Sequence, residues 1–317
     1  MSDFRAAILE WFDAGRVAPD RELEALRAGG LLPTPAEWRA FLGRLTLWLG
    51  TIALAAALIF FLAFNWDDLG RFAKFALVEV AILAGLVACW RVGLDNLTGK
   101  AVLLLLSLLT GALLALTGQV YQTGADSWEL FAYWAVLILP WVAVGRFSPL
   151  WLLWLALLNL TAWTYFGLFA DGEALLWALF GLNGLALAAW EAGHRAGPAW
   201  LRDDWPPRLI ALASGSAATA LIVWAIMDGG AGGSTAGAML AYVAWLAAVY
   251  AWYRRVRPDV SMLAGGLLSL IVAVVAFLSQ NLLGSHAGGF LFIGLVVIGM
   301  SAGGAVWLKS AAREQRA

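Results

Sequence analysis

The chain has 317 residues, of which 62 % are hydrophobic and only 13 % are charged, and its mean hydropathy is +0.81. A water-soluble domain uses about a quarter of its residues as Asp, Glu, Lys and Arg to cover its surface, so this composition excludes an ordinary soluble protein. The formal net charge of −1 gives no sign of a nucleic-acid partner, and we expect none. The expected partner of most of the surface is the lipid bilayer.

The first residues of the chain are rich in Arg, Glu and Asp, which is not how a cleavable secretory signal is built. Residues 2–13 and 19–28 predict two short amphipathic helices, separated by Gly15. This hairpin would lie on the membrane or dock a cytoplasmic partner. We divide the chain into a cytoplasmic N-terminal segment (1–42), a transmembrane domain (43–309) and a cytoplasmic tail (310–317).

Ten segments approach the roughly 20 apolar residues that a helix needs to cross a bilayer. The fourth is the shortest, and Pro140 either kinks it or marks its cytoplasmic end. The expected spans are 45–64, 72–90, 102–118, 130–144, 150–169, 174–190, 209–227, 236–252, 260–278 and 290–308.

The positive charges alternate between the two sides of these spans. Eighteen of the twenty Lys and Arg residues fall in the N-terminal segment, the tail and every second loop, and only Arg71 and Lys74 fall on the other side. Cytoplasmic loops retain positive charge, so both termini are predicted to be cytoplasmic. The expected fold class is an all-α, polytopic transmembrane helix bundle of about ten spans, N-in and C-in, with a short N-terminal helical hairpin.

The stretch 118–129, expected outside between spans three and four, is too polar to face lipid. One interpretation is a polar pocket or re-entrant loop that binds a substrate. The other is a capped loop, in which Asp126 or Ser127 caps the next helix and Gly124 supplies a positive φ. The candidate substrate-binding residues here are Gln119, Tyr121, Gln122, Asp126 and Trp128.

A second outer cluster, Asn65 to Arg71, lies between the first two spans. Asp67 and Arg71 stand four residues apart, the spacing of a local ion pair on a helix. Alternatively, Arg71 and Lys74 would hold an anionic substrate or a lipid phosphate. Asn65, Asp67 and Arg71 are therefore candidate site residues.

Glu79 is the single carboxylate that we expect well inside a span. Burying it in ionised form costs several kcal/mol unless it is paired or protonated. A proton-coupling or substrate-binding role competes with a neutral carboxyl that is hydrogen-bonded to Asn159, Asn183 or a hydroxyl of another helix. These two amides otherwise join helices, and small-residue pairs such as Gly299 with Gly303 are expected to allow close helix packing.

The motif Gly-Gln-x-Tyr-Gln-Thr-Gly-Ala-Asp-x-Trp-x-Leu-Phe at 118–131, with Asn65-Trp66-Asp67 upstream, resembles the bacterial membrane family catalogued as domain of unknown function "twenty-one fifty-seven". The resemblance implies a bacterial inner-membrane location. It also implies a partnership with a second envelope membrane protein that carries a Gly-Asp-Tyr-type motif. It supplies no activity.

Two hypotheses of function follow. The first is a transporter- or flippase-like carrier with an outward polar site, because ten helices with short loops match small secondary carriers. The second is a non-transporting scaffold, sensor or assembly partner of another envelope protein. The single cysteine, Cys89, and two histidines indicate no metal site and no cofactor. Enzyme motifs are missing, and an enzyme acting on a lipid-linked substrate through Asp126 and Glu129 is a distant third hypothesis.

Overall fold

The structure, a computed structural model, describes residues 32–227, 234–282 and 288–314, together with scattered residues between 10 and 27. Within these residues every regular element is a helix, and ten of the helices are long and apolar enough to cross a membrane. The prediction of an all-helical bundle with ten spans is therefore confirmed. The predicted hairpin at 2–28 falls largely outside the described residues, and the orientation of the spans stays a prediction.

The chain divides into two compact units, Met1–Leu116 and Thr117–Ala317. Unit 1 contains α3 (Pro35–Phe64), α4 (Arg71–Val92) and most of α5 (Leu97–Tyr121). Unit 2 contains the last turn of α5 and the elements α6 (Ser127–Gly145), α7 (Ser148–Phe169), α8 (Gly172–Ala196), η2 (Ala199–Arg202), α9 (Trp205–Met227), α10 (Ser234–Ala251), η3 (Trp252–Val256), α11 (Val260–Leu282) and α12 (Gly288–Glu314).

In unit 1, the first spanning helix begins well before residue 45 because its N-terminus is capped. The Thr34 hydroxyl accepts a hydrogen bond from the Glu37 N–H at 3.2 Å, and a Glu37 carboxylate oxygen accepts one from the Thr34 N–H at 2.7 Å. This reciprocal arrangement satisfies two backbone donors that a helix start leaves free. Pro35 occupies the first turn, where its missing N–H costs nothing.

Helices α4 and α5 of unit 1 pack closely where Gly85 faces Leu106. A Cβ atom added to Gly85 would lie 2.6 Å from a methyl carbon of Leu106, so a larger residue there would require the Leu106 side chain to move. Leu106 is fully buried, as is Val78 of α4.

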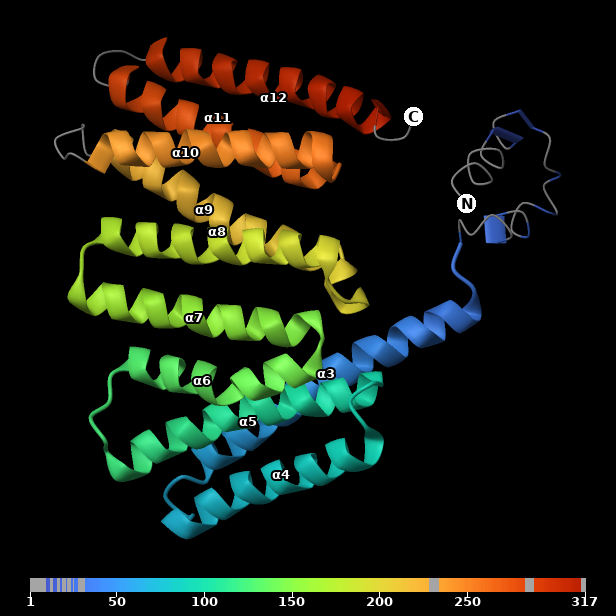
Figure 1. The fold of residues 1–317 in the computed structure, drawn as a ribbon, viewed down its shortest axis with the longest axis vertical. Coiled ribbons are helices and arrows are strands. Elements are labelled where there is room, and N and C mark those ends of the chain that lie inside the picture. Colours follow the sequence, from blue (N-terminus) through green and yellow to red (C-terminus); the bar gives the residue numbers. More distant parts are fainter. Residues whose placement is uncertain are drawn as a thin grey trace. The chain divides into compact units, whose positions relative to one another are not determined.

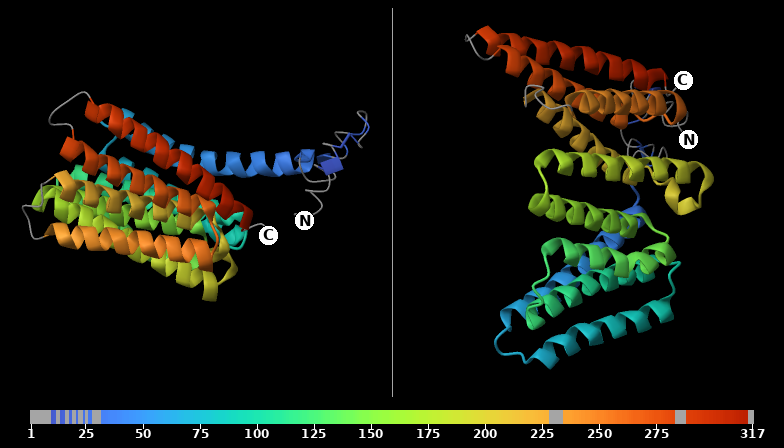
Figure 2. Two further views of the ribbon diagram at one scale, coloured as in Figure 1. Left: turned by 90° about the horizontal axis from the view of Figure 1, so that it is seen from above. Right: turned by 60° about the vertical axis from the view of Figure 1, so that its left-hand side comes forward.

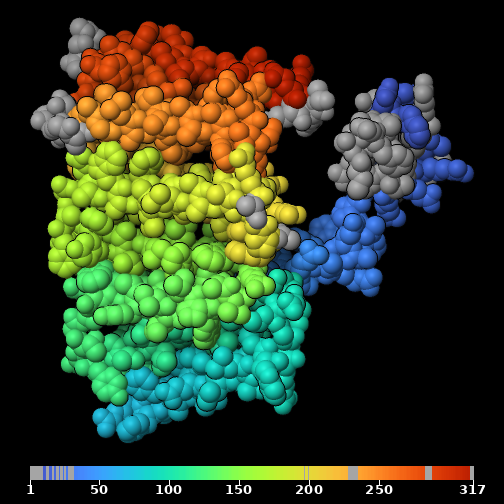
Figure 3. All heavy atoms as spheres, in the orientation of Figure 1, coloured from blue at the N-terminus to red at the C-terminus, as the bar shows by residue number. Residues whose placement is uncertain are grey.

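In unit 2, consecutive helices are antiparallel, and helices that are neighbours in sequence pack together (Figure 1). Both views of Figure 2 keep α11 beside α12, and Figure 3 shows the side chains of α7 and α8 in contact. Asn159 of α7 and Asn183 of α8 exchange two amide hydrogen bonds, at 2.6 and 3.1 Å. The two amides thus join helices, as one interpretation predicted.

Two expectations about local structure change. Helix α6 continues to Gly145, so Pro140 lies inside the helix and does not mark its end. The close packing expected at Gly299 and Gly303 of α12 is wrong for the described residues, since a Cβ added at either position would meet no atom within 4 Å. A glycine pair at helical spacing allows close packing but does not require it.

Candidate functional site

The stretch 118–129, which the sequence places outside, is a capped turn between α5 and α6. Helix α5 extends to Tyr121, the Thr123 N–H bonds to the Gly118 carbonyl at 3.3 Å, and Gln122 adopts a left-handed φ of 46°. These features form a Schellman-type helix end. Asp126 then caps α6, and its N–H donates to the Glu129 carboxylate at 3.1 Å. The capped-loop interpretation accounts for this geometry without a re-entrant segment.

The candidate residues of this turn lie at its surface. Gln119, Tyr121, Gln122 and Asp126 are exposed, and Tyr121 exposes 61 % of its surface. Trp128 is half-buried and packs edge-on against the Tyr165 ring, with 5.3 Å between the ring centroids. The turn therefore presents an amide-rich and phenol-rich surface, and its role in binding a substrate stays a prediction.

The turn between α3 and α4 places its cations on aromatic rings. The Asn65 amide donates to the Phe61 carbonyl at 2.8 Å. The Arg71 guanidinium lies 4.8 Å from the centre of the Phe72 ring, and the Lys74 ammonium lies 3.7 Å from the centre of the Trp66 ring. Each is a cation–π contact.

The predicted ion pair between Asp67 and Arg71 does not form in the described part of the chain. Asp67 is exposed and has no ionic partner there. Arg71 keeps its guanidinium on the aromatic face, with its side chain exposed. The anion-binding interpretation of this turn stays a prediction.

Glu79 is an exposed residue of α4 in unit 1. Its carboxylate makes no hydrogen bond or ion pair with any described residue. Asn159 and Asn183 bond to each other, and a bond from Glu79 to either amide or to a hydroxyl of another helix stays a prediction. Glu79 therefore marks a polar point on an otherwise apolar helix surface.

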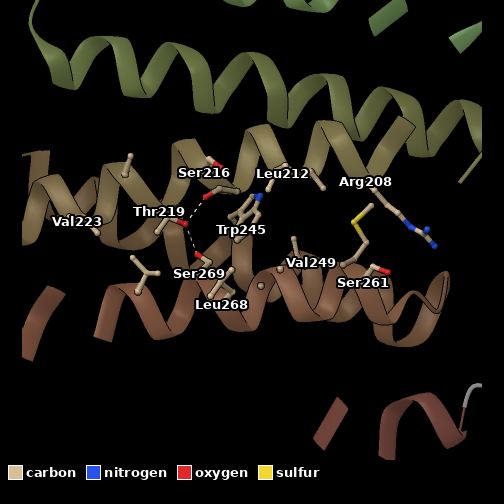
Figure 4. A pocket seen from close by; sticks show the side chains of 17 residues that line it. Arg208, Leu212, Ser216, Thr219, Val223, Trp245, Val249, Ser261, Leu268 and Ser269 are labelled. Atoms are coloured by element: carbon tan, nitrogen blue, oxygen red, sulfur yellow. Dashed lines mark hydrogen bonds between the residues drawn. The ribbon is translucent and has the colours of Figure 1, made fainter. Parts of the chain in front are cut away.

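In unit 2, a groove of about 500 Å³ runs between α9 and α11. We call it the α9–α11 groove. Trp245 and Val249 of α10 complete its wall (Figure 4). Its small lining residues recur at every fourth position on both helices: Ala211, Gly215 and Thr219 on α9, and Ser261, Gly265 and Ser269 on α11. Small residues at this spacing open a channel along the helix pair.

A row of hydroxyls crosses the groove nearer to its Val223 end than to Arg208 (Figure 4). Thr219 donates to the Gly215 carbonyl at 2.6 Å and lies 2.7 Å from the Ser269 hydroxyl, which lies 2.9 Å from the Tyr242 hydroxyl. Thr219 has only one hydroxyl proton. The bonds must therefore run from Tyr242 to Ser269, from Ser269 to Thr219, and from Thr219 to the carbonyl, which leaves spare lone pairs for donors of a ligand.

Arg208 lies at one end of the groove, opposite Val223 (Figure 4). Its Nε atom donates to Asp259 at 3.0 Å, while its side chain stays 46 % exposed. Asp259 is fixed in turn, because its other oxygen accepts the N–H of Ser261 at 2.9 Å at the start of α11. The groove thus has a charged end, an apolar length and a hydroxyl row.

A second polar site, which we call the Glu191 cluster, is buried near the same end of unit 2. It consists of Glu191 of α8 with Trp252, Tyr253 and Arg257. Glu191 is 5 % exposed and accepts hydrogen bonds from the Trp252 indole at 3.0 Å, the Tyr253 hydroxyl at 2.8 Å and the Arg257 guanidinium at 2.8 Å. Both carboxylate oxygens are therefore satisfied, as a buried charge requires.

A π-helical turn assembles this cluster. The Arg257 N–H bonds to the Trp252 carbonyl at 2.9 Å, five residues back, and this wider turn brings both side chains to one face. Arg257 also pairs with Asp204. Burial lowers the pKa of Arg257, but the hydrogen bonds and charges of Asp204 and Glu191 outweigh burial and raise it above its usual value. The Arg195 guanidinium covers the Trp252 ring, 4.2 Å from its centre.

The two sites of unit 2 share one connection. Asp259, which holds Arg208, donates its N–H to the Tyr253 carbonyl at 3.1 Å. The segment from Trp252 to Asp259 therefore joins the Glu191 cluster to the mouth of the α9–α11 groove. A movement of this segment at one site would therefore also move residues of the other site.

Residues 9–151 match the family described as predicted membrane protein (DUF2157). Over this range, which is less than half of the 317 residues, the chain is similar to the DUF2157 family. The resemblance carried by the outer motif is therefore confirmed, since the matched range includes 118–131 and the Asn65 turn. No curated protein and no solved structure matches the chain. The DUF2157 range ends in the first turn of α7, so the α9–α11 groove and the Glu191 cluster lie beyond it.

Sequence reasoning missed both sites of unit 2. The sixth span was expected to end at Trp190, which placed Glu191 just outside it, whereas α8 continues to Ala196. The groove had a visible signal in the repeated small residues of α9 and α11. The DUF2157 motif drew attention to unit 1 and the first turn of unit 2, where the polar residues are exposed.

Proposed function

We propose that the protein is a flippase-like carrier of lipid-like amphiphiles in the bacterial inner membrane. The observation that carries this proposal is the reach of the α9–α11 groove. Its lining extends from Arg208 to Val223, or ~22 Å at the helical rise of 1.5 Å per residue. One leaflet of hydrocarbon is only ~15 Å thick, half of the ~30 Å core. A groove of this length that begins at the membrane surface with Arg208 passes the bilayer midplane.

On this proposal the hydroxyl row lies near the bilayer midplane, where the free-energy cost of a polar head group in hydrocarbon is greatest. Thr219 is eleven residues from Arg208, or ~17 Å along the helix. A polar group without a hydrogen-bond partner in hydrocarbon costs several kcal/mol. Ser269 and Thr219 offer free lone pairs there, so they lower the barrier for a head group that moves along the groove while its chain stays in lipid.

The outer residues complete the same proposal. Gln119, Tyr121 and Asp126 form the outward polar site of the carrier, with the neighbouring Gln122 and Trp128. Their exposed amide, phenol and carboxylate groups are suited to the hydrogen-bonding groups of a lipid head. Asn65, Asp67 and Arg71 have the same role in unit 1.

The test is lipid movement in proteoliposomes that contain the full chain and a fluorescent phospholipid in both leaflets. A membrane-impermeant reductant quenches only outer-leaflet label, so movement shows as quenching beyond half. We expect the double variant Thr219→Val/Ser269→Ala to slow movement by about tenfold, which is ~1.4 kcal/mol of barrier.

The matched control is Thr164→Val/Ser310→Ala, which removes two hydroxyls from α7 and α12. This control should move lipid at the wild-type rate. If wild-type proteoliposomes quench no further than empty ones, the carrier proposal is wrong.

A second candidate function is an assembly partner of another envelope membrane protein. The observation that favours it is Glu79, an exposed carboxylate on a spanning helix without a partner among the described residues. Such residues in spanning segments usually face protein or water. On this proposal Glu79→Leu abolishes co-purification of a second membrane protein, whereas Leu83→Ala on the same helix does not. An unchanged set of co-purified proteins would reject it.

A further inference from the structure

The charged end of the α9–α11 groove has hydrogen-bonding capacity that the chain does not use. Arg208 donates to Asp259 through Nε alone, and its two terminal nitrogens have no partner among the described residues. These nitrogens carry four N–H groups in a planar fork, the geometry that matches a phosphate or carboxylate. Arg208 is therefore held at the mouth with its free donors available.

Asp259 fixes the orientation of the Arg208 side chain but compensates only part of its positive charge. Its Oδ1 atom accepts the N–H groups of Ser261 and Met262, at 2.9 and 3.4 Å, at the positive end of α11. Only its Oδ2 atom reaches Arg208. The Asp259 side chain is 9 % exposed and the Arg208 side chain 46 %, so an incoming anion meets the arginine.

The dimensions of the groove indicate which kind of apolar group it can hold. A volume of about 500 Å³ over ~22 Å of helix corresponds to a cross-section of roughly 20–25 Å². Carbon atoms in contact lie ~4 Å apart, so this section holds one hydrocarbon chain. An α-helix with its side chains is ~10–12 Å across and does not fit.

We propose that the α9–α11 groove binds an anionic phospholipid, with one acyl chain along the groove and the phosphate on the terminal nitrogens of Arg208. This inference rests on the proposed carrier function and names the substrate class of that site. The charge distribution predicts that the Arg208 end is cytoplasmic. The lipid would therefore be taken from the inner leaflet, where Arg208 meets its phosphate first.

The binding test uses the full chain in nanodiscs of phosphatidylcholine with a minor fraction of phosphatidylglycerol that carries a photoreactive acyl chain. Peptide mass spectrometry after illumination locates the crosslinks. We expect them on the α9–α11 groove, with a preference for phosphatidylglycerol over the matching phosphatidylcholine probe of about fivefold to tenfold.

Three variants test whether the preference for phosphatidylglycerol depends on Arg208. Arg208→Gln should lower it to less than about twofold, and Arg208→Lys should keep part of it because the charge remains but the fork does not. Arg202→Gln, which removes an exposed arginine of η2 outside the groove lining, should leave it unchanged. Thermal unfolding of each variant shows that the fold is intact.

The outcomes separate the two proposals. Equal crosslinking of both probes in the wild type, or a preference that survives Arg208→Gln, overturns the anionic-lipid site even if lipid still moves across proteoliposomes. A preference that depends on Arg208, without any lipid movement, supports the site and rejects the carrier. If inorganic phosphate alone protects Arg208 and crosslinks never reach the groove, the mouth binds a free anion and the lipid proposal fails.

Discussion

Glu79 and Glu191 both lie on long apolar helices, but their surroundings are opposite. Glu79 of α4 is exposed and makes no bond with any described residue, whereas Glu191 of α8 is 5 % exposed and accepts three side-chain donors. The cost of a carboxylate in a membrane protein depends strongly on its partners as well as on its depth. Glu191 is therefore a structural residue of unit 2, and Glu79 is free for a function that needs a partner from outside.

The largest expected effect comes from removing the Glu191 carboxylate. Glu191→Ala leaves Arg257, whose side chain is 16 % exposed, with one fewer acceptor, and it leaves the Trp252 indole and the Tyr253 hydroxyl without their acceptor. Breaking a buried pair in this way costs about 3–5 kcal/mol. We expect the lower end of that range, because Asp204 still pairs with Arg257.

The measurement is the free energy of unfolding in mixed micelles, with Glu79→Ala as the matched control. Glu79→Ala should change it by less than about 0.5 kcal/mol, since the residue is exposed and has no bond to a described residue to lose. Equal losses in the two variants would show that the contrast between the two carboxylates is wrong.

A smaller effect separates the donors of the Glu191 cluster. Tyr253→Phe removes one hydroxyl that donates to Glu191 at 2.8 Å and that belongs to a side chain only 2 % exposed. A hydrogen bond to a charged group contributes about 1.5–3 kcal/mol. The same substitution at Tyr250 of α10, which is 45 % exposed, should cost less than half of that. Similar values for Tyr253 and Tyr250 would remove the special role of the cluster.

A neutral polar pair shows how much a buried contact contributes to stability when it carries no charge. Asn159 and Asn183 exchange two hydrogen bonds between α7 and α8, at 2.6 and 3.1 Å. Hydrogen bonds between spanning helices average only about 0.6 kcal/mol in double-mutant cycles, so we expect a coupling of about 0.6–1.5 kcal/mol between Asn159→Ala and Asn183→Ala. A coupling as large as the Glu191 loss would mean that charge adds nothing to such contacts.

The sequence predicts the ten spans well because hydropathy is a local property. Long apolar runs must form helices in a membrane, where backbone groups need internal partners. Capping residues at Thr34 and Asp126 also lie close to their partners, so helix starts are readable from short motifs.

The partners of a buried polar group cannot be predicted from the sequence in the same way. Glu191 meets Trp252 and Arg257, which lie 61 and 66 residues away. No spacing along the chain indicates such a contact, and the π-turn that presents both residues depends on packing. For Glu79 the position within the span was visible in the sequence, but its exposure was not, because exposure depends on which helices pack beside α4.

The smallest expected effect tests whether the outer turn is only a turn. Gln122 adopts a φ of 46°, a left-handed conformation that glycine takes without strain. Gln122→Gly should therefore change the free energy of unfolding by no more than about 1 kcal/mol in either direction, because relief of strain offsets the added freedom of the unfolded chain. At neighbouring Gly124, where φ is 68°, Gly124→Ala should destabilise instead. If Gln122→Gly leaves stability unchanged but lowers lipid movement in proteoliposomes, the side chain belongs to the outward site. If movement also stays at the wild-type rate, Gln122 serves only the helix end, and the binding role of this turn has to come from Tyr121 or Asp126.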